Sequence, residues 1–210
     1  IGEVVRTLDI TKSLIDEQVR GSMRLLTERG QQLGAATLGA PVSLGDKTVP
    51  NLLLGKTSEV NQFDLVDGVT KLFGGTATLF VRSGDDFVRV STNVKKPDGS
   101  RAIGTLLDPK GKVIGDIRDG KAFYGVVQIL GNPFITGYEP MRDASGQIVG
   151  IWYVGYKAQI DAIKDEVGKL QLLHGGLLDV TDAKGKTIFA TANTPSQIDP
   201  QDWVSMSEPV

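Results

Sequence analysis

The chain has 210 residues, 40% hydrophobic and 23% charged, which is typical of a globular domain and excludes wholesale disorder. Its formal net charge is −2, and no basic run with interleaved aromatic residues indicates nucleic-acid binding. The absence of cysteine excludes disulfides, thiol catalysis and thiolate metal sites.

The first predicted element is a long helix from Glu3 to about Leu33. This stretch contains no proline and many helix formers, and it would be about 45 Å long at 1.5 Å per residue. A heptad-like seam with some polar interruptions runs along it, formed by Val5, Leu8, Ile15, Val19, Leu26 and Leu33. This seam fits packing on the helix's own domain, packing on a partner helix in a homodimer, or both; we expect both. Because the chain begins at Ile1, without Met and within this helical pattern, we expect a piece of a longer protein. No apolar run is long enough for a membrane helix, and no signal peptide is present.

The next predicted elements alternate between loop, strand and helix. Residues 34–50 are rich in Gly, Ala, Ser and Thr, which predicts a loop with or without a short strand. Asn51–Gly55 has the pattern of a buried strand, and Glu59–Phe73 that of an amphipathic helix. Thr76–Arg82 predicts a strand, followed by a hairpin turn at 83–86.

The strand after this turn, from Phe87 to Val94, alternates between apolar and polar residues. A period of two places Val88, Val90 and Val94 on one face, and Arg89, Ser91 and Asn93 on the other. The polar face is either solvent-facing surface or the floor of a polar pocket.

Three further strands complete a predicted sheet. Residues Leu106–Arg118 fit either a turn with a strand or a short helix, and Ala122–Leu130 and Pro133–Met141 predict a strand pair. Ile148–Tyr156 is mostly apolar and is expected at the centre of the sheet. With five strands from Thr76 onward, we predict an α+β fold with a mainly antiparallel sheet.

The C-terminal part departs from this plan. Ala158–Leu173 is predicted as a helix, and Leu177–Thr191 as a strand–turn–strand. The residues after it fit either a linker or a second, partial module, and the turn motif alone is too common to decide between them. The predicted organisation is a signalling helix over 1–35, a sensor domain over 36–157 and a connecting helix with the partial module over 158–210.

Sequence motifs do not indicate an enzyme. The single histidine, His174, lacks a metal-binding companion, and we predict neither a metal site nor a cofactor. The chain contains no G-x-S-x-G, P-loop or G-x-G-x-x-G motif. A carboxylate pair for glycoside hydrolysis is not indicated, and Asp85 and Asp86 are typical turn residues.

Several polar residues between the first and last of these sheet strands have the chemistry of a carboxylate site. Arginine binds carboxylates in bidentate fashion, hydroxyls and amides complete the shell, and tyrosine adds an apolar wall with a donor. Taken singly, each residue is explained at least as well by a place on the exposed surface or in the ordinary core as by ligand binding. The candidate ligand-binding residues are Arg89, Ser91, Asn93, Arg101, Thr105, Tyr124 and Tyr138.

Residues 89–109 (RVSTNVKKPDGSRAIGTLLDP) and 122–156 (AFYGVVQILGNPFITGYEPMRDASGQIVGIWYVGY) resemble a Cache domain. The closer similarity is to the single-Cache, Cache3/Cache2 fusion subfamily of bacterial chemoreceptors, sensor kinases and diguanylate cyclases. The resemblance rests on R-V-S-T-N, S-R-A-x-G-T, F-Y-G and Y-E-P occurring in this order. It implies a PAS-like sheet of five to six strands with a long N-terminal helix, outside the cytoplasmic membrane, with these seven residues lining its pocket.

The resulting hypothesis is an extracytoplasmic, periplasmic sensor domain of a transmembrane receptor, most simply a methyl-accepting chemotaxis protein. Its two arginines and two tyrosines are expected to converge on an enclosed hollow that holds a small organic acid or amino acid. Binding would shift the long helix against that of a homodimer partner. The alternatives are a histidine kinase or diguanylate cyclase sensor, a dimerisation module without a ligand, and an extracytoplasmic hydrolase.

Overall fold

The computed structural model describes residues 2–158, 179–181 and 187–190, with side chains for residues 15–158. The chain divides into two compact units, Ile1–Ala158 and Gln159–Val210. In the second unit, β9 (Asp179–Thr181) and β10 (Thr187–Ala190) pair antiparallel, in agreement with the predicted strand pair. The predicted helix at 158–173 and His174 lie outside the described residues, and the partial second module stays a prediction.

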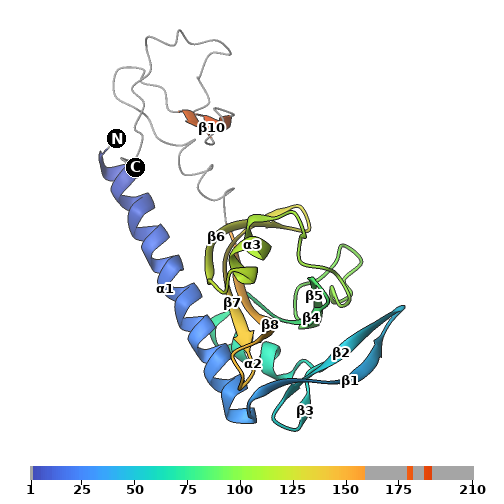
Figure 1. Ribbon diagram of the computed structural model, residues 1–210. Helices are drawn as coiled ribbons and strands as arrows, with labels where there is room; N and C mark the ends of the chain where they lie inside the picture. Colours follow the sequence, from blue (N-terminus) through green and yellow to red (C-terminus); the bar gives the residue numbers. More distant parts are fainter. Residues whose placement is uncertain (1, 159–178, 182–186, 191–210) are drawn as a thin grey trace. The chain divides into compact units, whose positions relative to one another are not determined.

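The long N-terminal helix is confirmed as α1 (Gly2–Leu33), and it runs along one side of the first unit (Figure 1). Its described buried apolar side chains, Val19, Met23 and Leu26, recur every three or four residues and contact the core. At Gly30 the helix passes so close to Trp152 that a Cβ would overlap the indole ring.

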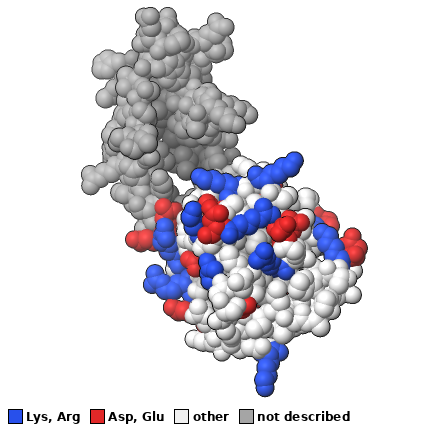
Figure 2. All heavy atoms as spheres, viewed as in Figure 1, with Lys and Arg blue, Asp and Glu red and all other residues white. Residues whose placement is uncertain are grey.

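Residues 34–50 differ from the prediction, because they form a full hairpin rather than a loop. Strand β1 (Ala36–Leu44) pairs antiparallel with β2 (Lys47–Leu54), and β3 (Thr57–Ser58) completes a three-stranded sheet. Glycine, alanine and proline in β1 have low strand propensity, so pairing with β2 overrides local preference. β1 carries no charge, and the hairpin region of the surface is mostly uncharged in Figure 2.

Helix α2 (Asp64–Phe73) begins five residues later than the sequence pattern predicts. Asn61 has a positive φ of 59°, and its N–H donates to the Val90 carbonyl at 2.8 Å. The preceding segment is therefore held against a sheet strand instead of joining the helix.

The central sheet confirms the α+β expectation. Its five strands lie in the order β5-β4-β8-β7-β6, all neighbours antiparallel, with β8 central as predicted. The ambiguous segment contains a short helix, α3 (Lys112–Arg118). The strands are β4 (Thr76–Ser83), β5 (Asp86–Thr92), β6 (Phe123–Ile129), β7 (Asn132–Arg142) and β8 (Ile148–Lys157).

The two sides of this sheet have separate cores. The helix face packs against α1, α2 and the hairpin through sheet residues such as Leu79, Val88 and Trp152. The loop face packs against α3 and the segment 94–107 through residues such as Phe80 and Tyr153. Which of the two faces a polar side chain occupies decides which partners it meets.

Candidate functional site

A β-bulge in β5 determines which polar residues share a face. Leu79 pairs with Ser91 and Phe80 pairs with Arg89, so Val90 is an extra residue in β5. Arg89 therefore lies on the loop face with Phe80, whereas Ser91 lies on the helix face with Leu79. The predicted alternation is wrong here, because an uninterrupted period of two would have kept Arg89 and Ser91 together.

Val94, too, is not on the predicted face. It packs in the core of the loop face, whereas Val88 and Val90 belong to that of the helix face.

Arg89 is the buried charge of the loop face. Its side chain lies over the Phe80 ring, 5.0 Å from guanidinium carbon to ring centroid, and the residue is only 6% exposed. Nη1 donates to Thr105 Oγ1 at 2.6 Å, but Nε is buried without a hydrogen-bond partner among the described residues. Burial lowers the pKa of Arg89, while the nearby Tyr138 and Tyr153 act in the opposite direction.

Thr105 is fixed by a loop that lies along the edge of β5. The Arg89 N–H donates to the Thr105 carbonyl, and the Gly104 N–H donates to the Arg89 carbonyl, both at 2.9 Å. Gly104 has a φ of 77°, a conformation that favours glycine. The Thr105 hydroxyl donates to the Ala102 carbonyl at 2.8 Å, which leaves its oxygen free to accept from Arg89.

Two tyrosines stand opposite each other on neighbouring strands of the same face. Tyr138 of β7 pairs with Tyr153 of β8, and their ring centroids are 4.8 Å apart. The Tyr153 hydroxyl is hydrogen-bonded to Thr76 at 3.0 Å, and burial raises the pKa of Tyr153 to about 12. Burial, followed by the charge of Tyr153, also raises the pKa of Tyr138, so at neutral pH both phenols keep their protons.

Ser91 and Asn93 point to the other side, toward α2 and the segment before it. The Ser91 hydroxyl donates to the Gln62 carbonyl. The Asn93 side chain accepts from the Ala77 N–H at 2.8 Å and donates to Thr70 Oγ1 at 3.0 Å. These bonds hold the end of β5 against α2 and do not converge with Arg89.

Arg101 is also turned toward α2. Its guanidinium donates two hydrogen bonds to Asp67, at 2.8 and 2.7 Å, and one to the Thr92 carbonyl at 2.8 Å. It lies 4.2 Å from the centroid of the Phe63 ring, and the hydrogen bond to Asp67 raises its pKa. The two arginines of the predicted site therefore do not face a shared hollow.

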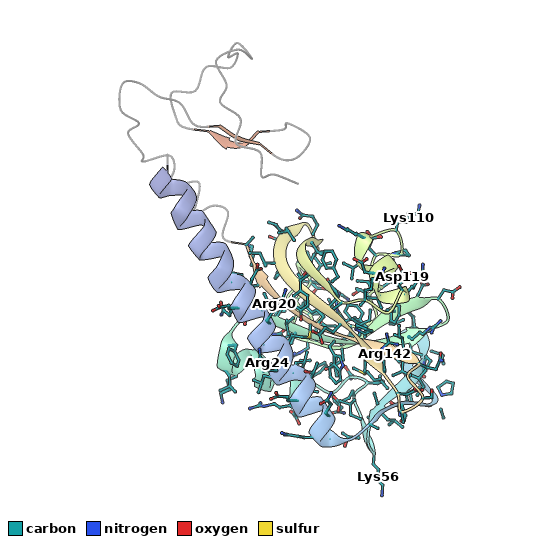
Figure 3. The ribbon with its side chains drawn as sticks, turned by 60° about the vertical axis from the view of Figure 1, so that its left-hand side comes forward. Arg20, Arg24, Lys56, Lys110, Asp119 and Arg142 are labelled. Carbon is teal, nitrogen blue, oxygen red and sulfur yellow. The ribbon has the colours of Figure 1, made fainter. Side chains whose placement is uncertain are left out.

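Tyr124 contacts the long helix. Its hydroxyl donates to Glu139 Oε1 at 2.5 Å, and the guanidinium of Arg20 lies over its ring at 4.2 Å. Figure 3 shows Arg20 projecting from α1 on the side of the sheet. Burial, followed by the hydrogen bond to Glu139, raises the pKa of Tyr124. This residue joins β6 to α1 and β7 rather than to Arg89.

Three of the seven predicted residues, Arg89, Thr105 and Tyr138, are thus brought together on the loop face. The sequence prediction missed Tyr153 and Phe80, which complete the surroundings of Arg89. The strand register contains the missing signal, because Tyr153 is the direct cross-strand neighbour of Tyr138 and Phe80 that of Arg89.

Two cavities lie away from this cluster. One of about 570 Å³ is formed by the β1–β2 hairpin and the β4–β5 turn, with Arg82 and Asp143 among its lining residues. The other, of about 350 Å³, lies between the end of α1 and β7, next to Glu139 and Trp152. In the described part of the chain, no helix is long and apolar enough to cross a membrane.

Comparison with known proteins identifies the family. The sensory domain of the Campylobacter jejuni chemoreceptor Tlp3 (CcmL) is similar at 14% identity and a TM-score of 0.49, covering 94% of this chain and 72% of that one. The Tlp3 ligand-binding domain in complex with L-valine is similar at 13% identity and a TM-score of 0.48, covering 90% and 67%. Curated proteins give no match. The model of the Cache 3/Cache 2 fusion domain matches residues 1–206. The chain therefore belongs to the Cache 3/Cache 2 fusion domain family, and it is a sensory module rather than an enzyme.

Proposed function

We propose that this domain binds a small carboxylate at Arg89, Thr105 and Tyr138, as the extracytoplasmic sensor of a transmembrane receptor. The observation that carries the proposal is the buried guanidinium of Arg89, whose Nε has no acceptor among the described residues. Arginine keeps its charge in proteins, and a buried charge without a counter-charge is unfavourable by on the order of several kcal/mol. An anion at this position would remove that penalty.

The neighbouring groups suit a carboxylate. Arg89 offers donors only, and the protonated hydroxyl of Tyr138 offers another. A carboxylate accepts at both oxygens, so it can bind the guanidinium and the phenol at once. Charge-assisted hydrogen bonds of this kind are roughly twice as strong as neutral ones. They are stronger still in a buried site, because the dielectric constant there is lower than in water.

The signal would reach α1 through the loop that carries Thr105. Arg101, four residues before Thr105, donates hydrogen bonds to Asp67 of α2. Helix α2 in turn packs against α1, and a Cβ at Gly68 would lie 3.1 Å from Arg29. Ligand at Arg89 would order this loop and so bias the position of α2 on α1. The ligand shifts the helix only by its difference in affinity for the two arrangements.

The output we favour is chemotaxis, in a membrane-anchored methyl-accepting protein whose periplasmic domain forms a homodimer through α1. Family membership and the length of α1 support this proposal. A histidine kinase or diguanylate cyclase would use the same sensor with another output, and a dimerisation module without a ligand is the third candidate.

A thermal-shift screen of short organic acids and amino acids tests ligand binding. We expect at least one carboxylate to raise the melting temperature of the wild-type domain and not that of Arg89→Met. Arg82→Met is the matched control, because Arg82 lies on the adjacent strand and donates to the Gly84 carbonyl at 3.0 Å. If no acid shifts the wild-type domain, the dimerisation module is the better account.

A further inference from the structure

We infer that the ligand of this site is a monocarboxylate that carries no ammonium group. The inference rests on the proposed function, because it takes Arg89 as the carboxylate-binding group. It is narrower than that proposal, which admits dicarboxylates and amino acids equally. Two observations support it: the site offers one cation for one carboxylate, and it offers few acceptors for an ammonium group.

The first observation concerns positive charge. A dicarboxylate of small size would bring two negative charges, and the second would need its own cation if it were buried beside Arg89. Arg101, the sequence candidate for that role, is bound to Asp67 by two hydrogen bonds on the other side of β5. Lys47 is joined to the loop by a hydrogen bond from its ammonium to the Gly104 carbonyl, at 2.8 Å. Among the residues with described side chains, Arg89 is therefore the one buried cation, and it balances one carboxylate.

The second observation concerns groups that could hold an ammonium. An amino-acid ligand would present three N–H donors, which require acceptors or a negative charge. The ion pairs among the described residues are Arg101–Asp67 and Lys121–Asp119, and neither involves Arg89. The titratable groups that affect the pKa of Arg89 are Tyr138 and Tyr153, and both are neutral phenols at neutral pH.

The remaining oxygens near Arg89 are already engaged. Thr105 Oγ1 accepts from Arg89 and donates to the Ala102 carbonyl, and the Tyr153 hydroxyl bonds to Thr76. The walls are aromatic: Phe80, Tyr138 and Tyr153 are each no more than 1% exposed. Aromatic rings pack favourably against a short apolar chain, and they supply no oxygen acceptors for the three N–H donors of an ammonium.

Three four-carbon ligands separate the possibilities: butyrate, succinate and L-2-aminobutyrate. Isothermal titration of the wild-type chain is expected to show butyrate binding at least tenfold more tightly than either of the others. Arg89→Met should lose the butyrate signal. If that variant does not fold, Thr105→Val, which replaces the hydroxyl with a methyl group at a partly exposed position, should weaken butyrate binding several-fold.

The outcomes distinguish this inference from the proposed function. Aminobutyrate or succinate binding as tightly as butyrate, with loss on Thr105→Val, would overturn the monocarboxylate inference and leave the carboxylate site in place. Absence of binding by all three ligands would overturn both. Butyrate binding that Arg89→Met and Thr105→Val leave unchanged would place the anion elsewhere and would also overturn both.

Discussion

Arg101 and Asp67 join the Thr105 loop to α2 through two nearly parallel hydrogen bonds of 2.8 and 2.7 Å. The sequence predicted that Arg101 binds the ligand, whereas in the structure Arg101 has a structural role. The same guanidinium also caps the Thr92 carbonyl, so it fastens the loop both to α2 and to the end of β5. Removal of this guanidinium should therefore destabilise the loop rather than remove a positive charge from the ligand site.

We expect Arg101→Met to lower the free energy of unfolding by about 1–2 kcal/mol. Both partners are partly exposed, so the ion pair itself contributes at most about 1 kcal/mol, and the lost bond to Thr92 adds about 1 kcal/mol. Urea denaturation measures the change. Asp67→Asn is the control, because it keeps the bond to Thr92 and should cost less. Full stability of Arg101→Met combined with complete loss of carboxylate binding would instead support direct ligand contact.

Thr105→Asp should act as a built-in ligand. The new carboxylate would lie beside Arg89 Nη1, where the Thr105 hydroxyl now accepts at 2.6 Å, and would neutralise the buried charge. We expect the variant to lose its response to butyrate and to melt at a higher temperature than Thr105→Asn, which has the same shape without the charge. Differential scanning fluorimetry with and without butyrate compares the two. Equal melting temperatures would show that Arg89 does not lack a counter-charge.

Gly30→Ala should destabilise the domain by about 1–3 kcal/mol, because its methyl group would overlap the Trp152 ring and force repacking between α1 and β8. Gly21→Ala provides the matched control in the same helix. A Cβ at Gly21 meets nothing within 4 Å, so alanine there should stabilise the helix by up to about 1 kcal/mol. Urea midpoints of the two variants should thus move in opposite directions, and movement in the same direction would contradict the close packing at Trp152.

Glu59 should make stability depend on pH. Burial, with a smaller contribution from Asp64, raises the pKa of Glu59 from 4.5 to about 7 in the folded state. Between these values the folded chain binds a proton that the unfolded chain has released, so stability falls as pH rises through this window. We expect a loss of about 2 kcal/mol in the wild type and a smaller one in Glu59→Gln, measured by urea denaturation at each pH. Parallel curves for both proteins would contradict a shifted carboxyl.

The strands and helices with strong local patterns were predictable. The apolar run of Ile148–Tyr156 indicated the central strand, and the uninterrupted helix formers before Leu33 indicated α1. The β1–β2 hairpin was not predictable, since the Gly-, Ala- and Pro-containing strand forms only when β2 is beside it. The start of α2 was misplaced because a backbone contact between Asn61 and Val90 interrupts an otherwise helical pattern.

The candidate site was partly predictable, for a related reason. Residue chemistry drew attention to Arg89 as a candidate, but pairing partners such as Asp67 for Arg101 and Glu139 for Tyr124 depend on tertiary contacts between distant segments. Side-chain alternation along β5 would have assigned Arg89 and Ser91 to opposite faces of the sheet only if the bulge at Val90 had been known. A valine carries no local signal for a bulge, in contrast to glycine.

The extra residue at Val90 also affects how relatives of this protein should be compared. A relative with one residue fewer at this point would turn its next side chains to the opposite side, although their types and order were unchanged. Arginines in the same alignment column could then be a ligand anchor in one protein and a structural clamp in another. Specificity within the family is better compared by strand phase than by residue identity.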